Sequence, residues 1–85
     1  MERITVPGPD GGFSVPAGLE QEAAERLGRY EDAHGRLLAR QEELAGRMEA
    51  LKAEGNQKTA VFRELFAEKL TIQNTLTLWE TYGIH

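Results

Sequence analysis

The sequence predicts a mainly α-helical protein, in which a β-hairpin over residues 1–16 precedes a long, coiled-coil-like antiparallel αα-hairpin over residues 17–85. Three observations predict this fold. All three prolines lie in the first 16 residues, among turn-forming glycines. An apolar heptad pattern begins soon after residue 19, and a Gly-Asn pair at 55–56 separates two long proline-free segments. We expect a single domain that completes a four-helix bundle as a dimer.

The β-hairpin is predicted from two short alternating segments. Ile4-Thr5-Val6 and Phe13-Ser14-Val15 each read apolar, polar, apolar, and a cluster of turn formers over residues 7–12 lies between them. An isolated two-stranded hairpin is marginal in water. Its apolar side chains must therefore pack on a helix or on a second chain.

The first helix is expected over about residues 19–54. Its heptad trace consists of Ala23, Leu27, Tyr30, His34, Leu37, Gln41, Leu44, Met48 and Leu51. Four acid-first i,i+4 pairs are expected to support it, namely Glu22–Arg26, Glu25–Arg29, Asp32–Arg36 and Glu43–Arg47. Polar residues within the trace, such as His34 and Gln41, are typical of positions that fix register and oligomeric state.

The second helix is expected from about residue 59 to 82. Gly55-Asn56 ends the first helix, and either Thr59 or Asn56 caps the second, which Gly83 closes. Its apolar stripe is Val61, Phe62, Leu65, Phe66, Lys69, Ile72, Gln73, Leu76 and Trp79.

The two expected helices differ in length. At 1.5 Å per residue the first spans about 54 Å and the second about 36 Å. The second therefore reaches back only to about residue 30, and the N-terminal hairpin or another subunit must cover what lies beyond. Three further apolar residues fall off the stripe of the second helix: Leu70, Leu78 and Tyr82. A dimer would bury both the uncovered part of the first helix and these three apolar side chains.

The expected core and dimer seam is one set of residues from both helices. It comprises Leu27, Tyr30, His34, Leu37, Gln41, Leu44, Met48, Leu51, Phe62, Leu65, Phe66, Ile72, Leu76 and Trp79. Gly28, Gly35 and Gly46 fall within about 20° on the first helix, where each costs about 0.5–1 kcal/mol relative to alanine. They indicate either a second, close-approach interface or a solvated face of small residues.

Two further groups of residues have two interpretations each. An arginine flank on the first helix, formed by Arg29, Arg36, Arg40 and Arg47, could contact nucleic acid or could be paired with acids on the same helix. No aromatic residues interleave with these arginines, and the chain is acidic overall. The C-terminal apolar cluster of Trp79, Tyr82 and Ile84 could anchor a partner or pack the open end of a bundle.

Composition excludes several classes of function. The 85 residues carry a net charge of −4, which we expect to be spread along paired helix faces, and no cysteine, so a disulfide framework, a thiolate metal site and a cysteine nucleophile are excluded. The two histidines lack metal-site spacing, and no nucleophile–base pair or phosphate-binding loop is present. We therefore expect no enzyme, cofactor or metal. No apolar run of about 20 residues and no secretion signal are found, so we expect a cytoplasmic protein.

Two segments of the chain resemble those of a known group of proteins. Met1-Glu2-Arg3-Ile4-Thr5 and Arg26-Leu27-Gly28-Arg29-Tyr30-Glu31-Asp32 are similar to small uncharacterised proteins of phages and prophages of gut Clostridia. Those proteins begin with a Met-Glu-Arg-Leu-Thr-like strand and carry an Arg-Leu-x-x-Tyr-Glu-Asp segment on a helix. Many of them also contain cysteines and a Thr-Gly-Leu-Thr-Pro-like turn, which this chain lacks. The resemblance implies a source and a compartment, but no activity.

The sequence favours a non-enzymatic, self-associating helical hairpin that acts as an interaction or accessory protein. One alternative is a small nucleic-acid-associated regulator that uses the arginine flank. Another is an acidic inhibitor that occupies a basic site on a host or phage protein.

Overall fold

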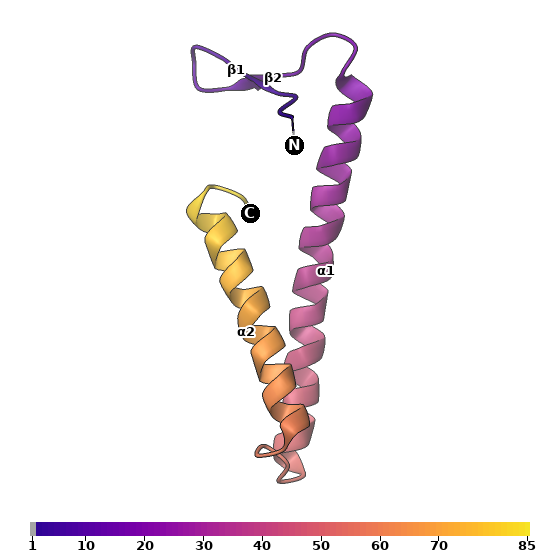
Figure 1. The fold of residues 1–85 in the computed structure, drawn as a ribbon, viewed down its shortest axis with the longest axis vertical. Helices are drawn as coiled ribbons and strands as arrows, with labels where there is room; N and C mark the ends of the chain where they lie inside the picture. The colour runs from indigo at the N-terminus through magenta and orange to yellow at the C-terminus, as the bar shows by residue number, and fades with distance from the viewer. Residues whose placement is uncertain (1) are drawn as a thin grey trace. The chain divides into compact units, whose positions relative to one another are not determined.

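The computed structural model describes residues 2–85 and confirms the predicted fold class (Figure 1). The elements, in chain order, are β1 (Val6–Pro7), β2 (Phe13–Ser14), α1 (Glu20–Ala53) and α2 (Ala60–Thr81). The chain divides into two compact units, here called the N-terminal unit (up to His34) and the C-terminal unit (Gly35–His85). The division lies within α1 and is separate from the change from hairpin to helix, which falls between Ser14 and Glu20.

The two strands form an antiparallel pair that is shorter than predicted. Val6 lies opposite Ser14, and Pro7 lies opposite Phe13. Residues 4, 5 and 15 were expected in the strands but lie outside them. The pairing is short because Pro7 has no N–H to donate and the turn begins directly after it.

A tight turn connects the strands. The Gly8 N–H donates to the Gly12 carbonyl at 2.7 Å, and the Gly11 N–H donates to the Gly8 carbonyl at 3.2 Å. Gly11 has φ +85°, in the left-handed region that glycine adopts without steric cost. Asp10 adds a side-chain acceptor, with Oδ1 3.0 Å from the Gly12 nitrogen. Hydrogen bonds within the turn thus pair the backbone N–H groups of Gly8, Gly11 and Gly12.

α1 ends where the sequence predicted. The Gly55 N–H donates to the Lys52 carbonyl at 3.0 Å, and the Asn56 N–H donates to the Leu51 carbonyl at 2.7 Å. These two bonds, with φ +76° at Gly55, form a Schellman motif, which satisfies carbonyls that the last turn leaves unpaired.

α2 is capped at both ends. Of the two predicted caps, Thr59 is the one used, because its hydroxyl accepts from the Phe62 N–H at 3.2 Å. At the other end, the Ile84 N–H donates to the Trp79 carbonyl at 2.9 Å, and Gly83 has φ +82°. The prediction that Gly83 closes this helix is confirmed.

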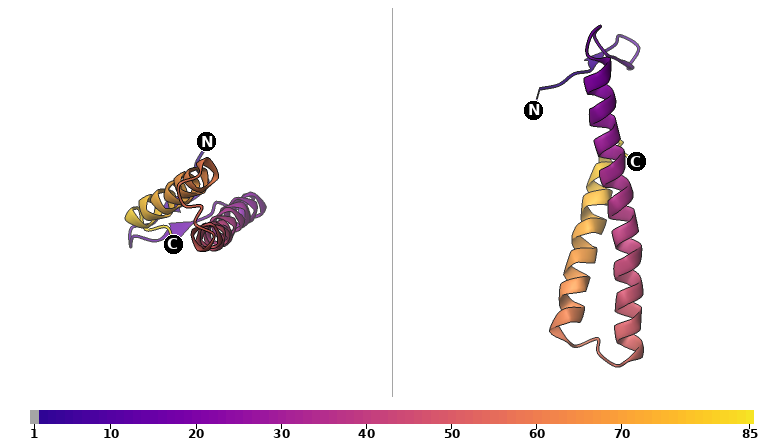
Figure 2. Two further views of the ribbon diagram at one scale, coloured as in Figure 1. Left: turned by 90° about the horizontal axis from the view of Figure 1, so that it is seen from below. Right: turned by 90° about the vertical axis from the view of Figure 1, so that its right-hand side faces the viewer.

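The core lies in the C-terminal unit, where residues 35–53 of α1 and α2 run antiparallel from their connection (Figure 1, Figure 2). Leu44 is fully buried, and Met48, Leu65 and Ile72 are each 6% exposed. Four half-buried side chains pack against them: Leu37, Leu51, Phe62 and Leu76. These eight residues were all predicted for the core and seam, and the αα-hairpin is confirmed.

Two residues of the predicted core and seam are exposed in this chain. Leu27 is 59% exposed and Phe66 is 53% exposed. Phe66 lies about 100° around α2 from Leu65, so it cannot share the face that contacts α1. Neither residue belongs to the core of one chain, and their place in a dimer seam stays a prediction. No helix within residues 2–85 has the length and apolar character to cross a membrane.

Candidate interaction surface

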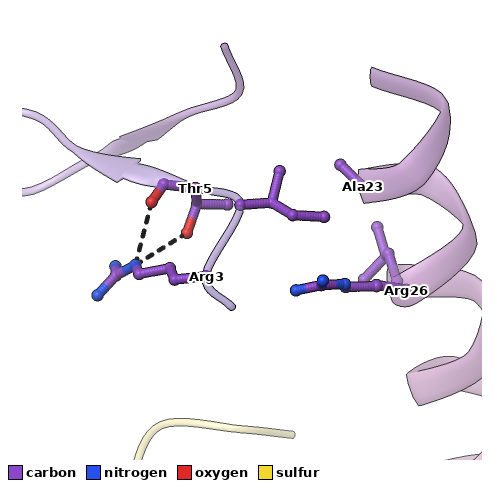
Figure 3. Close-up of a pocket in the computed structure, with 6 residues that line it drawn as sticks. Arg3, Thr5, Ala23 and Arg26 are labelled. Carbon is purple, nitrogen blue, oxygen red and sulfur yellow. Dashed lines mark hydrogen bonds between the residues drawn. The ribbon is translucent and has the colours of Figure 1, made fainter. Parts of the chain in front are cut away.

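In the N-terminal unit, the segment before β1 lies against the first turns of α1 (Figure 3). Together they line a shallow cavity of about 380 Å³. The lining residues are Arg3, Ile4, Thr5, Ala23, Arg26 and Leu27. Of the residues beyond the reach of the second helix, which either the N-terminal hairpin or another subunit was expected to cover, Ala23 is half-buried and Leu27 keeps its large exposure.

Two arginines hold this segment. Arg26 donates to the backbone carbonyl of Glu2, and its Nη2 lies 3.4 Å from Glu22 Oε1. Arg3 Nε donates to the Thr5 carbonyl at 3.1 Å, and its guanidinium carbon lies 5.4 Å from the centre of the Phe13 ring. Besides the strand pair and its turn, these arginine contacts join the parts of the N-terminal unit, whose described residues include no buried apolar side chain.

Charge is divided unequally between the two units. The N-terminal unit holds three basic and seven acidic side chains, whereas the C-terminal unit holds seven of each. The whole net charge of −4 therefore lies in the N-terminal unit, and the C-terminal unit is neutral. The sequence analysis had spread this charge along the helices.

Of the arginine flank, one member is engaged by α2. Arg40 donates to Glu68 through Nε at 2.5 Å and Nη2 at 3.0 Å, and Nη1 contacts Glu43 at 2.8 Å. The two-bond contact with Arg40 lowers the pKa of Glu68 below its ordinary value, although partial desolvation opposes the shift. The same bonds raise the pKa of Arg40. This cross-helix pair was not predicted.

The predicted i,i+4 pairs are mostly wrong. Within residues 2–85, Glu22–Arg26 forms, but no ion pair joins Glu25 to Arg29, Asp32 to Arg36 or Glu43 to Arg47. Exposed ion pairs gain little Coulomb energy in water and cost side-chain entropy, so they need not form. The three unpaired arginines of the flank, Arg29, Arg36 and Arg47, are exposed.

The three helical glycines of α1, here called the glycine line, have open space beside them in a single chain. A β-carbon added at Gly28, Gly35 or Gly46 would meet no atom within 4 Å. No other part of this chain therefore requires glycine at these positions. The interpretation as an interface between chains stays a prediction beside the solvated one.

The polar members of the predicted stripes differ in burial. His34, Gln41 and Lys69 are half-buried, whereas Gln73 is exposed. The His34 ring lies 5.9 Å from the ring of Tyr30 in a tilted arrangement. Three of these polar residues are therefore partly buried, and a role of any of them in fixing register stays a prediction.

The C-terminal aromatic cluster is open. Trp79 is half-buried, Tyr82 is 76% exposed and Ile84 is 39% exposed. The end of α2 and the residues after it thus expose apolar side chains to solvent.

Among residues 2–85, no three His, Asp or Glu side chains are grouped so as to hold a metal ion.

No family model matches this chain, and neither a curated protein nor a solved structure is similar to it.

Proposed function

We propose that this chain is a non-enzymatic interaction protein that works as a self-associated helical hairpin. The main support for the proposal is that the chain has a small buried core and a large accessible surface. Only four side chains in residues 2–85 are buried apolar ones. The accessible surface is 6694 Å², whereas a compact folded chain of this mass exposes about 5,000 Å².

The excess is of the size that association removes. It amounts to roughly 1,600 Å² per chain, about twice what each partner buries in a standard interface and within the range of about 1,000–2,500 Å² per partner in obligate dimers. Much of it is apolar: the exposed large side chains of the C-terminal unit are Leu38, Val61, Phe66, Leu70, Leu78, Tyr82 and Ile84. A neutral unit also does not repel its own copy, since it carries no net charge.

Light scattering coupled to size exclusion tests the proposal. At micromolar concentration the full chain should elute at a mass of at least two copies of its 9.5 kDa. The far-ultraviolet circular dichroism signal should lose helix on dilution, because folding and association are linked. A helical, cooperatively unfolding monomer at the same concentration would refute self-association.

A second function is favoured by the acidic N-terminal unit. Its charge of −4 lies beside exposed Val6 and Phe13, which suits the surface to a basic partner with an apolar contact site. A pull-down from bacterial lysate should recover such a partner with the native chain. The partner should be lost when Glu22, Glu25 and Asp32 become glutamine.

Changing three acids of the C-terminal unit, Glu42, Glu49 and Glu54, to glutamine gives a matched control with the same change in net charge. Loss of the partner from both triple variants would assign the effect to overall charge and remove support for the N-terminal surface.

A further inference from the structure

In the middle of α2, the charged side chains lie toward α1 and not toward water. Between Leu65 and Trp79 the ionisable side chains are Glu68 and Lys69. Glu68 binds Arg40 of α1, and Lys69 is half-buried on the side that contacts α1. A surface helix ordinarily places its charges opposite its buried face. From Ala67 to Thr81 the side of α2 turned away from α1 is therefore uncharged, and the exposed Arg63 lies on that side in the first turn of the helix.

This side is here called the outer face of α2. It consists of Ala67, Leu70, Thr71, Asn74, Leu78 and Thr81, all of them exposed. At 100° per residue these positions fall within an arc of about 100°, centred opposite the buried Leu65 and Ile72. The apolar side chains are substantial, since Leu70 is 46% exposed and Leu78 is 56% exposed.

The spacing along the outer face matches a helix–helix seam. Ala67, Leu70, Asn74, Leu78 and Thr81 follow one another at steps of three, four, four and three residues. Their mean of about 3.5 is the repeat that keeps one side of a helix against a partner helix. Asn74 stands at the middle of the series, where a polar residue fixes register in paired helices.

The threonine hydroxyls of this face already donate hydrogen bonds to backbone carbonyls of α2. Thr71 Oγ1 donates to the Ala67 carbonyl at 3.0 Å, and Thr81 Oγ1 donates to the Thr77 carbonyl at 3.0 Å. At the edge of the face, Thr75 Oγ1 donates to the Thr71 carbonyl at 2.8 Å. A hydroxyl that is already bonded costs less to bury, and each threonine presents its methyl group as apolar surface.

We propose that the outer face of α2 packs against the same face of a second copy of this chain. The inference rests on the self-association proposed above and assigns its interface. An identical partner is favoured because the face from Ala67 to Thr81 has no charge to bind an acidic or basic ligand, whereas it is complementary to itself across a two-fold axis. The neutral C-terminal unit and the unburied excess of about 1,600 Å² agree with this occupant.

Single cysteines provide the test, because the chain has none of its own. Leu70→Cys, Asn74→Cys and Leu78→Cys place a thiol on the outer face. Ala39→Cys and Ala50→Cys place one on exposed positions of α1 as controls. In an oxidising glutathione buffer, at least one outer-face variant should form most of its mass as a disulfide-linked dimer, and the controls should not. A crosslink at residue 74 alone would indicate antiparallel α2 helices, and crosslinks at all three would indicate parallel ones.

A charge substitution gives a second readout. Leu78→Glu should raise the dissociation constant of the dimer at least about tenfold, since it places one carboxylate from each copy in the apolar contact. Leu38→Glu, at an exposed leucine of α1 (45%), should leave it within about threefold. A dimer that crosslinks through α1 and tolerates Leu78→Glu would overturn the assignment while self-association stands. A monomer throughout would overturn both.

Discussion

The two units of this chain are stabilised in different ways. The C-terminal unit is neutral and is built around four buried apolar side chains contributed by α1 and α2. The N-terminal unit carries the whole charge of −4, and every side chain described in it is exposed or half-buried. A hydrogen bond from Arg26 to the Glu2 carbonyl and the contact of Arg3 with the Phe13 ring join its segments instead.

The difference indicates that the two units contribute unequally to the stability of the protein. Apolar burial supplies most folding free energy, whereas exposed hydrogen bonds and ion pairs contribute little each. Stability should therefore depend on the C-terminal unit, and the N-terminal unit should tolerate change. Four experiments test this difference in stability between the two units.

Truncating a leucine in each unit should give the largest contrast. Leu44→Ala, at the fully buried position, should cost about 2–5 kcal/mol of unfolding free energy. Leu27→Ala, at a side chain 59% exposed, should cost less than about 1 kcal/mol. Urea denaturation followed by circular dichroism, at one fixed protein concentration, measures both. Equal losses would show that the N-terminal unit also contributes a core.

Removal of the α2 cap should have the next largest effect. Thr59→Ala deletes the acceptor of the Phe62 N–H and should cost about 1 kcal/mol. Ser14→Ala removes an exposed hydroxyl of β2 and should change stability by less than about 0.5 kcal/mol. Thermal unfolding compares the two. A loss from Ser14→Ala as large as that from Thr59→Ala would contradict the expected tolerance of the hairpin.

Glycine substitutions should change stability with opposite signs. Gly28→Ala and Gly46→Ala lie on α1, one in each unit, with open space for a β-carbon, and each should stabilise by about 0.5–1 kcal/mol. Gly55→Ala should destabilise by about 1 kcal/mol, because φ is +76° there. The dissociation constant should be measured alongside stability. If Gly28→Ala or Gly46→Ala weakens association, the glycine line is an interface after all.

The smallest effect should come from Glu68 at acid pH. The folded state lowers the pKa of Glu68, so the unfolded chain binds its proton more readily. The contribution of this carboxylate is complete above the ordinary glutamate pKa and is lost as pH falls through the lower folded value. The difference in melting temperature between the native chain and Glu68→Gln should therefore shrink from pH 7 to pH 3. Glu49→Gln serves as the exposed control, and a pH-independent difference would contradict the assigned role of the pair.

The sequence predicted best what is determined locally. The turn at Gly8–Gly12, the cap at Thr59 and the ends at Gly55 and Gly83 depend on backbone freedom and on hydrogen bonds within a few residues. The stripe from Leu37 to Leu51 was also correct, because helical periodicity fixes which side chains share a face.

Long-range features were predicted less well. Arg40 was assigned to a flank of α1, but its partner Glu68 depends on how α2 is rotated against α1, which no local pattern records. The boundary between His34 and Gly35 leaves no local signal, since α1 continues across it. The unequal charge of the two units follows from that boundary and was missed with it.

The capped connection between the helices has a consequence for folding kinetics. Only residues 54–59 separate α1 from α2, and bonds on both sides already fix its ends. Contacts between the helices can therefore spread outward from the connection, each new one closing only a slightly larger loop. Chains with such low contact order fold in microseconds to milliseconds. If two copies associate as proposed, a slower phase should depend on protein concentration, because the encounter of two folded hairpins would then limit the rate.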